Sequence, residues 1–229
     1  EEDWAKDPIL IAAGSVEIFD IAVNKEHSLL YFAAADSIYK LSSFSSKKVV
    51  NITANNTPSS ATFTSASRIY LKTSVENPDY LYAMVINSSG AFGGLYLTTN
   101  QSEWKNITTA TVLPFNYNKG TTCGAICVDE NYAGSVYIGG SSIYKGVKYD
   151  GFQWTKSSLN EHELGATNYM GNVYCSSSFI HSGVNDIVQT KATDEDGNVS
   201  DVFYVATNGG VYMTDDGFAT IQNINRGLN

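Results

Sequence analysis

The chain has 229 residues, of which 43% are hydrophobic and 16% charged, and its formal net charge at pH 7 is −9. The hydrophobic content supports a folded core and excludes an intrinsically disordered chain. Because Lys and Arg are not clustered, the acidic balance argues against binding to nucleic acid or to an anionic membrane surface. The chain also lacks an apolar run of roughly 20 residues, so we expect no membrane insertion.

In chain order, a unit of four short apolar strands occurs four times. The first strands are FDIAV (19–23), RIYLKT (68–73), GAICV (124–128) and DIVQTK (186–191). The second strands are LLYFA, YLYAMV, SVYIG and VFYVA, and the third are SIYKL, GLYLT, SIYKG and GVYMT. The fourth strands are VVNI, WKNI, QWTKS and TIQNI. Turns join the strands of each unit, and this pattern predicts antiparallel meanders.

Tyrosines mark the same positions of every unit. The third strands carry Tyr39, Tyr96, Tyr144 and Tyr212, and the second strands carry Tyr31, Tyr82, Tyr137 and Tyr204. No segment shows a convincing helical period. We therefore predict an all-β chain made of β-propeller blades, four four-stranded antiparallel meanders, because one meander cannot bury both of its faces alone. The recurrent tyrosines are expected to pack between blades.

The unit boundaries define the predicted organisation. Residues 1–229 form a single β-propeller segment with blades at about 16–52, 66–109, 122–158 and 184–226. Asp3-Trp4 resembles the end of a third turn and INRGLN resembles the start of another unit, so we expect a segment of a larger propeller. A complete four-bladed ring is the alternative.

A long insertion at 158–183 separates the third unit from the fourth. Connections of this length are often functional. The insertion contains Cys175, which could pair with Cys123 or Cys127 or remain a buried thiol. Cys123 and Cys127 cannot bridge each other, because four residues along one strand place them roughly 13 Å apart.

Segments 77–108, 135–154 and 202–228 resemble blades of the Asp-box, or BNR-repeat, propellers, with sortilin-like and xyloglucan-hydrolase-like repeat proteins as the most similar groups. The family motif runs Ser/Thr-x-Asp-x-Gly-x-Thr-Trp in the turn between the third and fourth strands. Its partial matches are Asp215 and Gly217 in unit four, Asp150, Gly151 and Trp154 in unit three, and Trp104 with Asn100 in unit two. The resemblance implies a structural turn on the outer rim, in which Asp accepts amide hydrogen bonds and Gly adopts positive φ.

The resemblance also raises two enzyme classes. Sialidases hold the substrate carboxylate with three arginines, and this chain has only Arg68 and Arg226. A xyloglucan-cleaving glycoside hydrolase needs two carboxylates facing its cleft, and spacing singles out no pair. Asp20 and Asp186 are the candidate catalytic residues, because they lie on innermost strands that would line a central channel. Hydrogen bonding to neighbouring backbone is their alternative role.

The stretch TDEDGNVSD (193–201) resembles part of a calcium loop, since Asp194, Asp196 and Asn198 alternate. An EF-hand would need Gly at its sixth position and Glu at its twelfth, and neither is present. The sequence favours a hairpin tip, with a weakly bound calcium ion as the alternative. No other cofactor is expected.

The insertion supplies the candidate binding residues. His162 and His181 bracket it without the spacing of a zinc site. Tyr169 and Phe179 could stack on a carbohydrate ring.

Together these features predict a non-catalytic, extracellular or cell-surface β-propeller module that presents loops for binding a glycan or a protein. Its other expected partner is the remaining blades of a larger chain. One alternative is part of a glycoside hydrolase of the xyloglucan-cleaving type. Another is a structural spacer in a large secreted protein.

Overall fold

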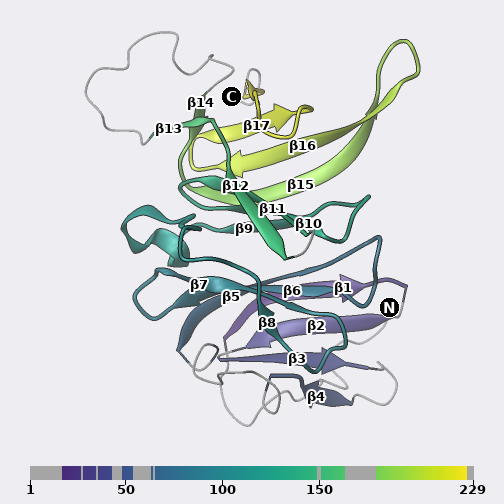
Figure 1. Ribbon diagram of the computed structural model, residues 1–229, viewed down its shortest axis with the longest axis vertical. Helices are drawn as coiled ribbons and strands as arrows, with labels where there is room; N and C mark the ends of the chain where they lie inside the picture. Colours follow the sequence, from purple (N-terminus) through teal and green to yellow (C-terminus); the bar gives the residue numbers. More distant parts are fainter. Residues whose placement is uncertain are drawn as a thin grey trace, which may run out of the picture.

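A computed structural model of the chain describes residues 17–26, 28–34, 36–42, 48–53, 63, 65–148, 151–162 and 179–225. The prediction of an all-β chain with four four-stranded antiparallel meanders is confirmed. Figure 1 shows the four sheets following one another along the molecule, from β1–β4 in purple to β15–β18 in yellow-green. Among the described residues, no helix has the length and apolar character needed to cross a bilayer.

Each sheet is a meander of four consecutive strands, which we call a blade. Blade 1 consists of β1 (Ile18–Asn24), β2 (Leu29–Ala34), β3 (Ser37–Leu41) and β4 (Val49–Asn51). Blade 2 consists of β5 (Ala66–Thr73), β6 (Leu81–Asn87), β7 (Phe92–Thr98) and β8 (Lys105–Asn106). Blade 3 consists of β9 (Ala125–Val128), β10 (Ser135–Gly139), β11 (Ile143–Lys148) and β12 (Phe152–Lys156). Blade 4 consists of β15 (Val184–Thr193), β16 (Val199–Thr207), β17 (Gly210–Thr214) and β18 (Gln222–Asn223).

Two connections contain structure of their own. The 3₁₀ helix η1 (Asn116–Thr121) lies between blades 2 and 3. Within the predicted insertion, β13 (Asn160–His162) pairs in parallel with β14 (Phe179–His181). A two-stranded sheet therefore joins the two ends of the insertion, and nothing in the sequence pattern indicated this pairing. Cys175 lies outside the described residues.

The same backbone hydrogen bond ends all four blades. The residue after the outer strand donates its N–H to a carbonyl on the third strand, at 2.9 Å for Ile52 to Ile38 and for Ile107 to Leu95. The corresponding bonds are Ser157 to Ile143 at 2.9 Å and Ile224 to Val211 at 3.1 Å. The four units are thus equivalent in structure as well as in sequence.

A separate apolar core fills each of the three interfaces between consecutive blades. Tyr31 and Tyr96 belong to the core between blades 1 and 2, Tyr82 and Tyr144 to the next, and Tyr137 and Tyr212 to the last. Second-strand tyrosines therefore face the following blade, and third-strand tyrosines face the preceding one. Strands β6 and β10 are buried along almost their whole length because a blade covers each face.

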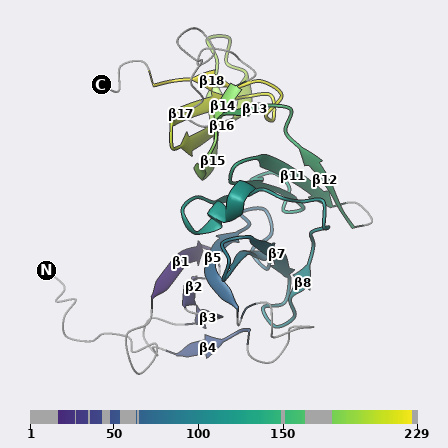
Figure 2. The same cartoon turned by 90° about the vertical axis from the view of Figure 1, so that its left-hand side faces the viewer.

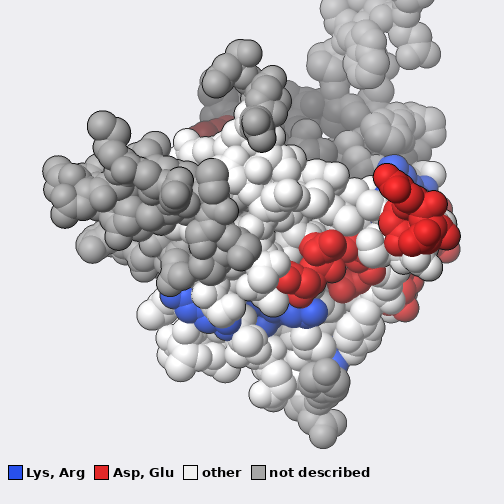
Figure 3. Space-filling view, turned by 90° about the horizontal axis from the view of Figure 1, so that it is seen from above, with Lys and Arg blue, Asp and Glu red and all other residues white. Residues whose placement is uncertain are grey.

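The blades are arranged along an arc. Strand β1 lies against β5, β5 against β9, and β9 against β15, so the first strands of the blades are the innermost ones. Figure 2 shows β1 and β5 on one side of this arc and the outer strands β8 and β12 on the other. Seen from above, acidic side chains gather on one side of the surface (Figure 3).

Candidate functional site

The innermost strands of all four blades line an open cleft with a volume of about 430 Å³, which we call the axial cleft. Its charged lining residues are Asp20 from β1, Arg68 and Lys72 from β5, and Asp186 from β15. Blade 3 contributes only Gly124, Ala125 and Ile126, which carry no charge. The two candidate catalytic carboxylates thus line one cleft, together with two cations that the sequence analysis had not placed there.

A β-bulge precedes three of these charged residues. The pairing register shifts between Ile18 and Asp20, between Ala66 and Arg68, and between Val184 and Asp186. A bulge adds a residue to one strand and re-aims the side chains that follow it. The same local irregularity therefore directs a charged side chain into the cleft in blades 1, 2 and 4.

Asp20 joins blade 1 to blade 2. Its Oδ1 accepts a hydrogen bond from the N–H of Ile21 at 2.8 Å, and its Oδ2 accepts one from the N–H of Leu71 at 2.7 Å. Burial raises the pKa of Asp20, and these amides and the charges of Arg68 and Lys72 offset the effect only in part. Because both oxygens hold backbone amides, this carboxylate serves as an anchor between two innermost strands.

Asp186 is exposed, and its Oδ1 accepts a hydrogen bond from the N–H of Ile187 at 2.9 Å. This bond repeats the one between Asp20 and Ile21. Both Asp20 and Asp186 therefore accept a hydrogen bond from a neighbouring backbone amide, which was the alternative to a catalytic role. Asp186 differs from Asp20 in remaining open to a molecule that enters the cleft.

Arg68 holds a hydrogen-bond donor that is not used. Its guanidinium lies over the ring of Tyr70, with Cζ 4.7 Å from the ring centroid. Its Nε is buried and has no hydrogen-bond partner among the residues that the structure describes. A buried donor without an acceptor is costly in a native protein and often marks a place that a ligand or water occupies.

The turn between β17 and β18 depends on Asp216 rather than on the predicted Asp215. Oδ1 of Asp216 accepts hydrogen bonds from the N–H groups of Ala219 at 3.0 Å and Thr220 at 2.9 Å. Oδ2 accepts the hydroxyl of Thr220 at 2.6 Å, and the hydroxyl of Thr214 donates to Oδ1 at 2.8 Å. The carboxylate that closes this turn therefore lies one residue later than the resemblance implied.

This shifted register changes the role of the neighbouring residues. Gly217 has a positive φ of 69°, but Phe218 occupies the position of the motif glycine, with φ 74°. Asn100 repeats the role of Asp216 in blade 2, because its Oδ1 accepts the N–H groups of Ser102 and Glu103. Gly151 adopts φ 131°, and Asp150 lies outside the described residues.

Trp104 and Trp154 each form a hydrogen bond with the preceding blade. Nε1 of Trp104 donates to the carbonyl of Ile52 at 3.0 Å, and Nε1 of Trp154 donates to the carbonyl of Ile107 at 2.8 Å. The accepting carbonyls are equivalent, since each follows the outer strand of its blade. These tryptophans connect neighbouring blades at the outer rim.

Asp194, Asp196 and Asn198 form the tip of the β15–β16 hairpin. Oδ1 of Asp194 accepts the N–H groups of Asp196 at 3.0 Å and Asn198 at 2.8 Å, and Oδ2 accepts the Asn198 amide at 2.9 Å. Hydrogen bonds from Asn198 are the main reason that the pKa of Asp194 is lowered. The carboxylate is engaged in closing the turn.

The predicted binding residues of the insertion do not form an exposed surface in the part that the structure describes. Phe179 and His181 are buried, and Nδ1 of His181 lies 2.7 Å from the carbonyl oxygen of Ser182. Burial argues against stacking of a sugar ring on Phe179. His162 is the last residue of β13, and Tyr169 lies outside the described residues.

No protein-family model matches the chain, and no curated protein matches it. Among solved structures, it is similar to the extracellular domain of BT4673 from B. thetaiotaomicron, which is described as a hybrid two-component system in one structure and as a one-component system in another. Both have a TM-score of 0.52 and 14% identity, and they cover 96% and 94% of this chain. A structure of a nidogen/laminin complex has a TM-score of 0.43 and 9% identity, with 90% of this chain and 78% of that chain covered.

At this level of identity, the similarity concerns the fold alone. This chain spans 23% of the length of the BT4673 domain in both structures.

Proposed function

We propose that the chain is a segment of an extracellular or cell-surface β-propeller that binds a glycan or a protein without catalysing a reaction. The axial cleft is the proposed binding surface. The observation that carries the proposal is the buried Nε of Arg68, which has no hydrogen-bond partner among the described residues, on a residue that lines the same cleft as the exposed Asp186. A ligand that offers an acceptor to Arg68 and a donor to Asp186 would satisfy both groups.

The cleft has the size of a ligand site, since pockets for small ligands usually measure about 300–1,000 Å³. Its volume of about 430 Å³ fits one or two sugar rings or a peptide side chain. The extracellular location is supported by the fold, which the chain shares with an extracellular domain.

The two end blades support a larger propeller. The face of blade 4 that would meet a following blade exposes 37% of Tyr204, whereas the equivalent Tyr31, Tyr82 and Tyr137 are at most 2% exposed. Ile21 on blade 1 is 57% exposed, although its counterparts Leu71, Ile126 and Ile187 are buried. Further blades would cover both faces.

A glycoside hydrolase is the second candidate, because Asp20 and Asp186 line the same cleft. The raised pKa of Asp20 would suit a general acid. However, an acid must approach the glycosidic oxygen, and both oxygens of Asp20 already hold backbone amides. The non-catalytic function therefore agrees better with the geometry.

Two screens test the proposal: a glycan array, and co-purification of the chain with an extracellular protein mixture. Calorimetry then measures the affinity for each ligand that the screens identify. We expect a bound ligand whose affinity falls in Arg68→Gln and in Asp186→Asn, while Val75→Ser in an exposed turn leaves it unchanged. Release of reducing sugar from a β-glucan panel, lost in Asp186→Asn, would establish the hydrolase instead. Absence of both binding and hydrolysis would favour a spacer.

A further inference from the structure

A second cavity lies on the outer rim, away from the axial cleft. It has a volume of about 580 Å³ and lies between blades 2 and 3, so we call it the rim groove. Strand β8 and the turn after it form one wall, and the β11–β12 hairpin forms the other. In Figure 2 these strands lie on the side of the arc opposite to β1 and β5.

The floor of the groove is apolar and well supported. Leu97 and Ile107 are buried, and Phe152 is half-buried. The ring of Phe152 stacks on Trp154, with centroids 6.2 Å apart and an interplanar angle of 27°. Trp154 is itself fixed by its hydrogen bond to the carbonyl of Ile107. The groove therefore offers a pre-positioned aromatic ring.

Two lysines line the groove, and neither has a carboxylate partner in the part of the chain that the structure describes. Nζ of Lys148 donates to the hydroxyl of Tyr80 at 3.0 Å and lies 5.3 Å from the centroid of the Tyr80 ring. Lys105 is exposed and makes no hydrogen bond or ion pair with the residues that the structure describes. Glu103 also lines the groove but is not paired with either lysine.

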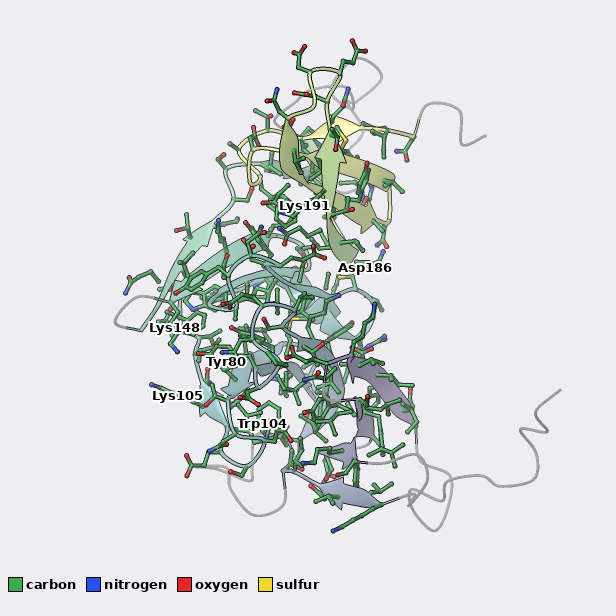
Figure 4. The ribbon with its side chains drawn as sticks, turned by 90° about the vertical axis from the view of Figure 1, so that its right-hand side faces the viewer. Tyr80, Trp104, Lys105, Lys148, Asp186 and Lys191 are labelled. Carbon is green, nitrogen blue, oxygen red and sulfur yellow. The ribbon has the colours of Figure 1, made fainter. Side chains whose placement is uncertain are left out.

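This arrangement is unusual for a chain with a net charge of −9. By contrast, Lys191 on blade 4 forms an ion pair with Asp201 at 2.8 Å. Figure 4 shows Lys148, Tyr80 and Lys105 on one side of the molecule and Asp186 of the axial cleft on the other. The rim groove thus combines two lysines, which form no ion pair among the described residues, with one glutamate and an aromatic floor.

We propose that the rim groove binds an acidic oligosaccharide, with a sugar carboxylate between Lys105 and Lys148 and the apolar face of a sugar ring on Phe152. Ammonium groups form charge-assisted hydrogen bonds with carboxylates. The hydroxyls of Thr99 and Thr109 on the rim suit the many hydroxyls of such a ligand. This site is separate from the axial cleft and goes beyond the function proposed for that cleft.

An acidic peptide fits the groove less well. Peptides commonly bind by adding a strand to an exposed sheet edge. The outer strand beside the groove, β8, contains only two residues, so it offers little edge for main-chain pairing. Two lysines are also too few for a nucleic-acid backbone, whose binding depends on many phosphate contacts.

Isothermal titration with tetragalacturonate tests the proposal, with cellotetraose as the neutral saccharide and hexaglutamate as the acidic peptide. We expect that tetragalacturonate binds and that the other two ligands do not. Its affinity should be lower at roughly 0.5 M salt than at roughly 0.05 M salt, because salt screens charge pairs. The double variant Lys105→Gln/Lys148→Gln should lose about tenfold or more in affinity, the loss expected when hydrogen bonds to a charged group are removed.

Lys191→Gln is the matched control, since it removes a lysine outside the groove and should leave affinity unchanged. Thermal melts of all variants check that they fold. Phe152→Ser should weaken binding without changing its salt dependence, because it removes the apolar contact and no charge.

Failure to bind tetragalacturonate, or unchanged affinity in the double variant, would overturn the proposal. Equal binding of hexaglutamate would replace the saccharide with an acidic peptide. Arg68→Gln should leave this binding intact, so loss of the rim site and loss of the axial site are distinguishable.

Discussion

Asp216 shows how one carboxylate fixes a tight turn and how a motif can be misaligned in a sequence. Two acidic residues precede Gly217, and the resemblance to an Asp-box assigned the role to the first of them. The structure gives it to the second, because only Asp216 reaches the N–H groups of Ala219 and Thr220. A glycine two residues after Asp215 suggested the wrong register, whereas Phe218 adopts the positive φ that the motif glycine would have.

We predict that Asp216→Ala lowers the free energy of unfolding by about 1 kcal/mol, since several amide and hydroxyl donors lose their acceptor at a solvent-exposed site. Asp215→Ala is the matched control and should change it by less than about 0.5 kcal/mol. Urea denaturation followed by tryptophan fluorescence measures both. A larger decrease in the free energy of unfolding for Asp215→Ala than for Asp216→Ala would show that Asp215 stabilises the turn instead.

The contribution of Asp216 should depend on pH. Desolvation raises its pKa, but hydrogen bonds from Thr220, Thr214 and Ala219 outweigh this effect, so the pKa is lowered overall. A carboxyl whose folded pKa lies below its unfolded value stabilises the fold above the unfolded value, and this stability is lost as pH falls through the folded pKa.

The difference in unfolding free energy between the wild type and Asp216→Ala should therefore shrink as pH falls from about 6 to below about 3. Denaturation curves of the wild type and of Asp216→Ala across this range measure the difference. A difference that grows at low pH would contradict the hydrogen-bond assignment.

Residues of the axial cleft could be predicted only in part. The position of Asp20 and Asp186 on innermost strands indicated that they line a channel, and the structure places both in the cleft. Arg68 was considered only as one member of an incomplete arginine triad. Its orientation depends on a bulge after Ala66, and a single sequence does not show where a strand gains an unpaired residue.

At the scale of elements, strands were more predictable than the connections between them. The four repeats of four strands could be predicted from apolar runs and turn residues, because each strand is specified by its own sequence. The parallel pairing of β13 with β14 was missed, since it joins residues on either side of a long insertion. The apolar character of Phe179 reflects burial in that pairing rather than an exposed binding surface.

Each tryptophan hydrogen bond links two blades, and its loss should be measurable. We predict that Trp104→Phe lowers the free energy of unfolding by about 2–3 kcal/mol, because it leaves a cavity and removes a donor from the carbonyl of Ile52. Trp154→Phe should cost about 1 kcal/mol, since its side chain is only half-buried and mainly the hydrogen bond is lost. Chemical denaturation compares them, and equal costs would contradict the difference in burial.

At the scale of the whole molecule, the blades follow one rule of orientation. Blades 2 and 3 each pack one tyrosine against the preceding blade and another against the following blade, whereas blade 1 packs Tyr31 and blade 4 packs Tyr212 against the one neighbouring blade. Among the second-strand and third-strand tyrosines of the four blades, Tyr39 and Tyr204 belong to none of the three interface cores described. Tyr39 instead stacks on Phe32 of its own blade, with ring centroids 5.3 Å apart.

The two end faces should therefore promote association of the isolated chain. One face exposes Ile21 and Val23 and the other exposes Val188 and Tyr204, and in the interior of the molecule the equivalent faces bury one another. Because the two faces differ, they would pair head to tail, and the chains would form a ring if the rotation between them closes or an open assembly if it does not.

We expect sedimentation velocity to show concentration-dependent association of this chain. Ile21→Lys and Tyr204→Lys should each reduce it, because a charge on either face must be desolvated when the faces meet. Val75→Lys is the control, since Val75 is 72% exposed in a turn outside both faces. A monomer at every concentration would indicate that neither face binds a blade of this type. Retention of assembly in both lysine variants would place the contact on another surface.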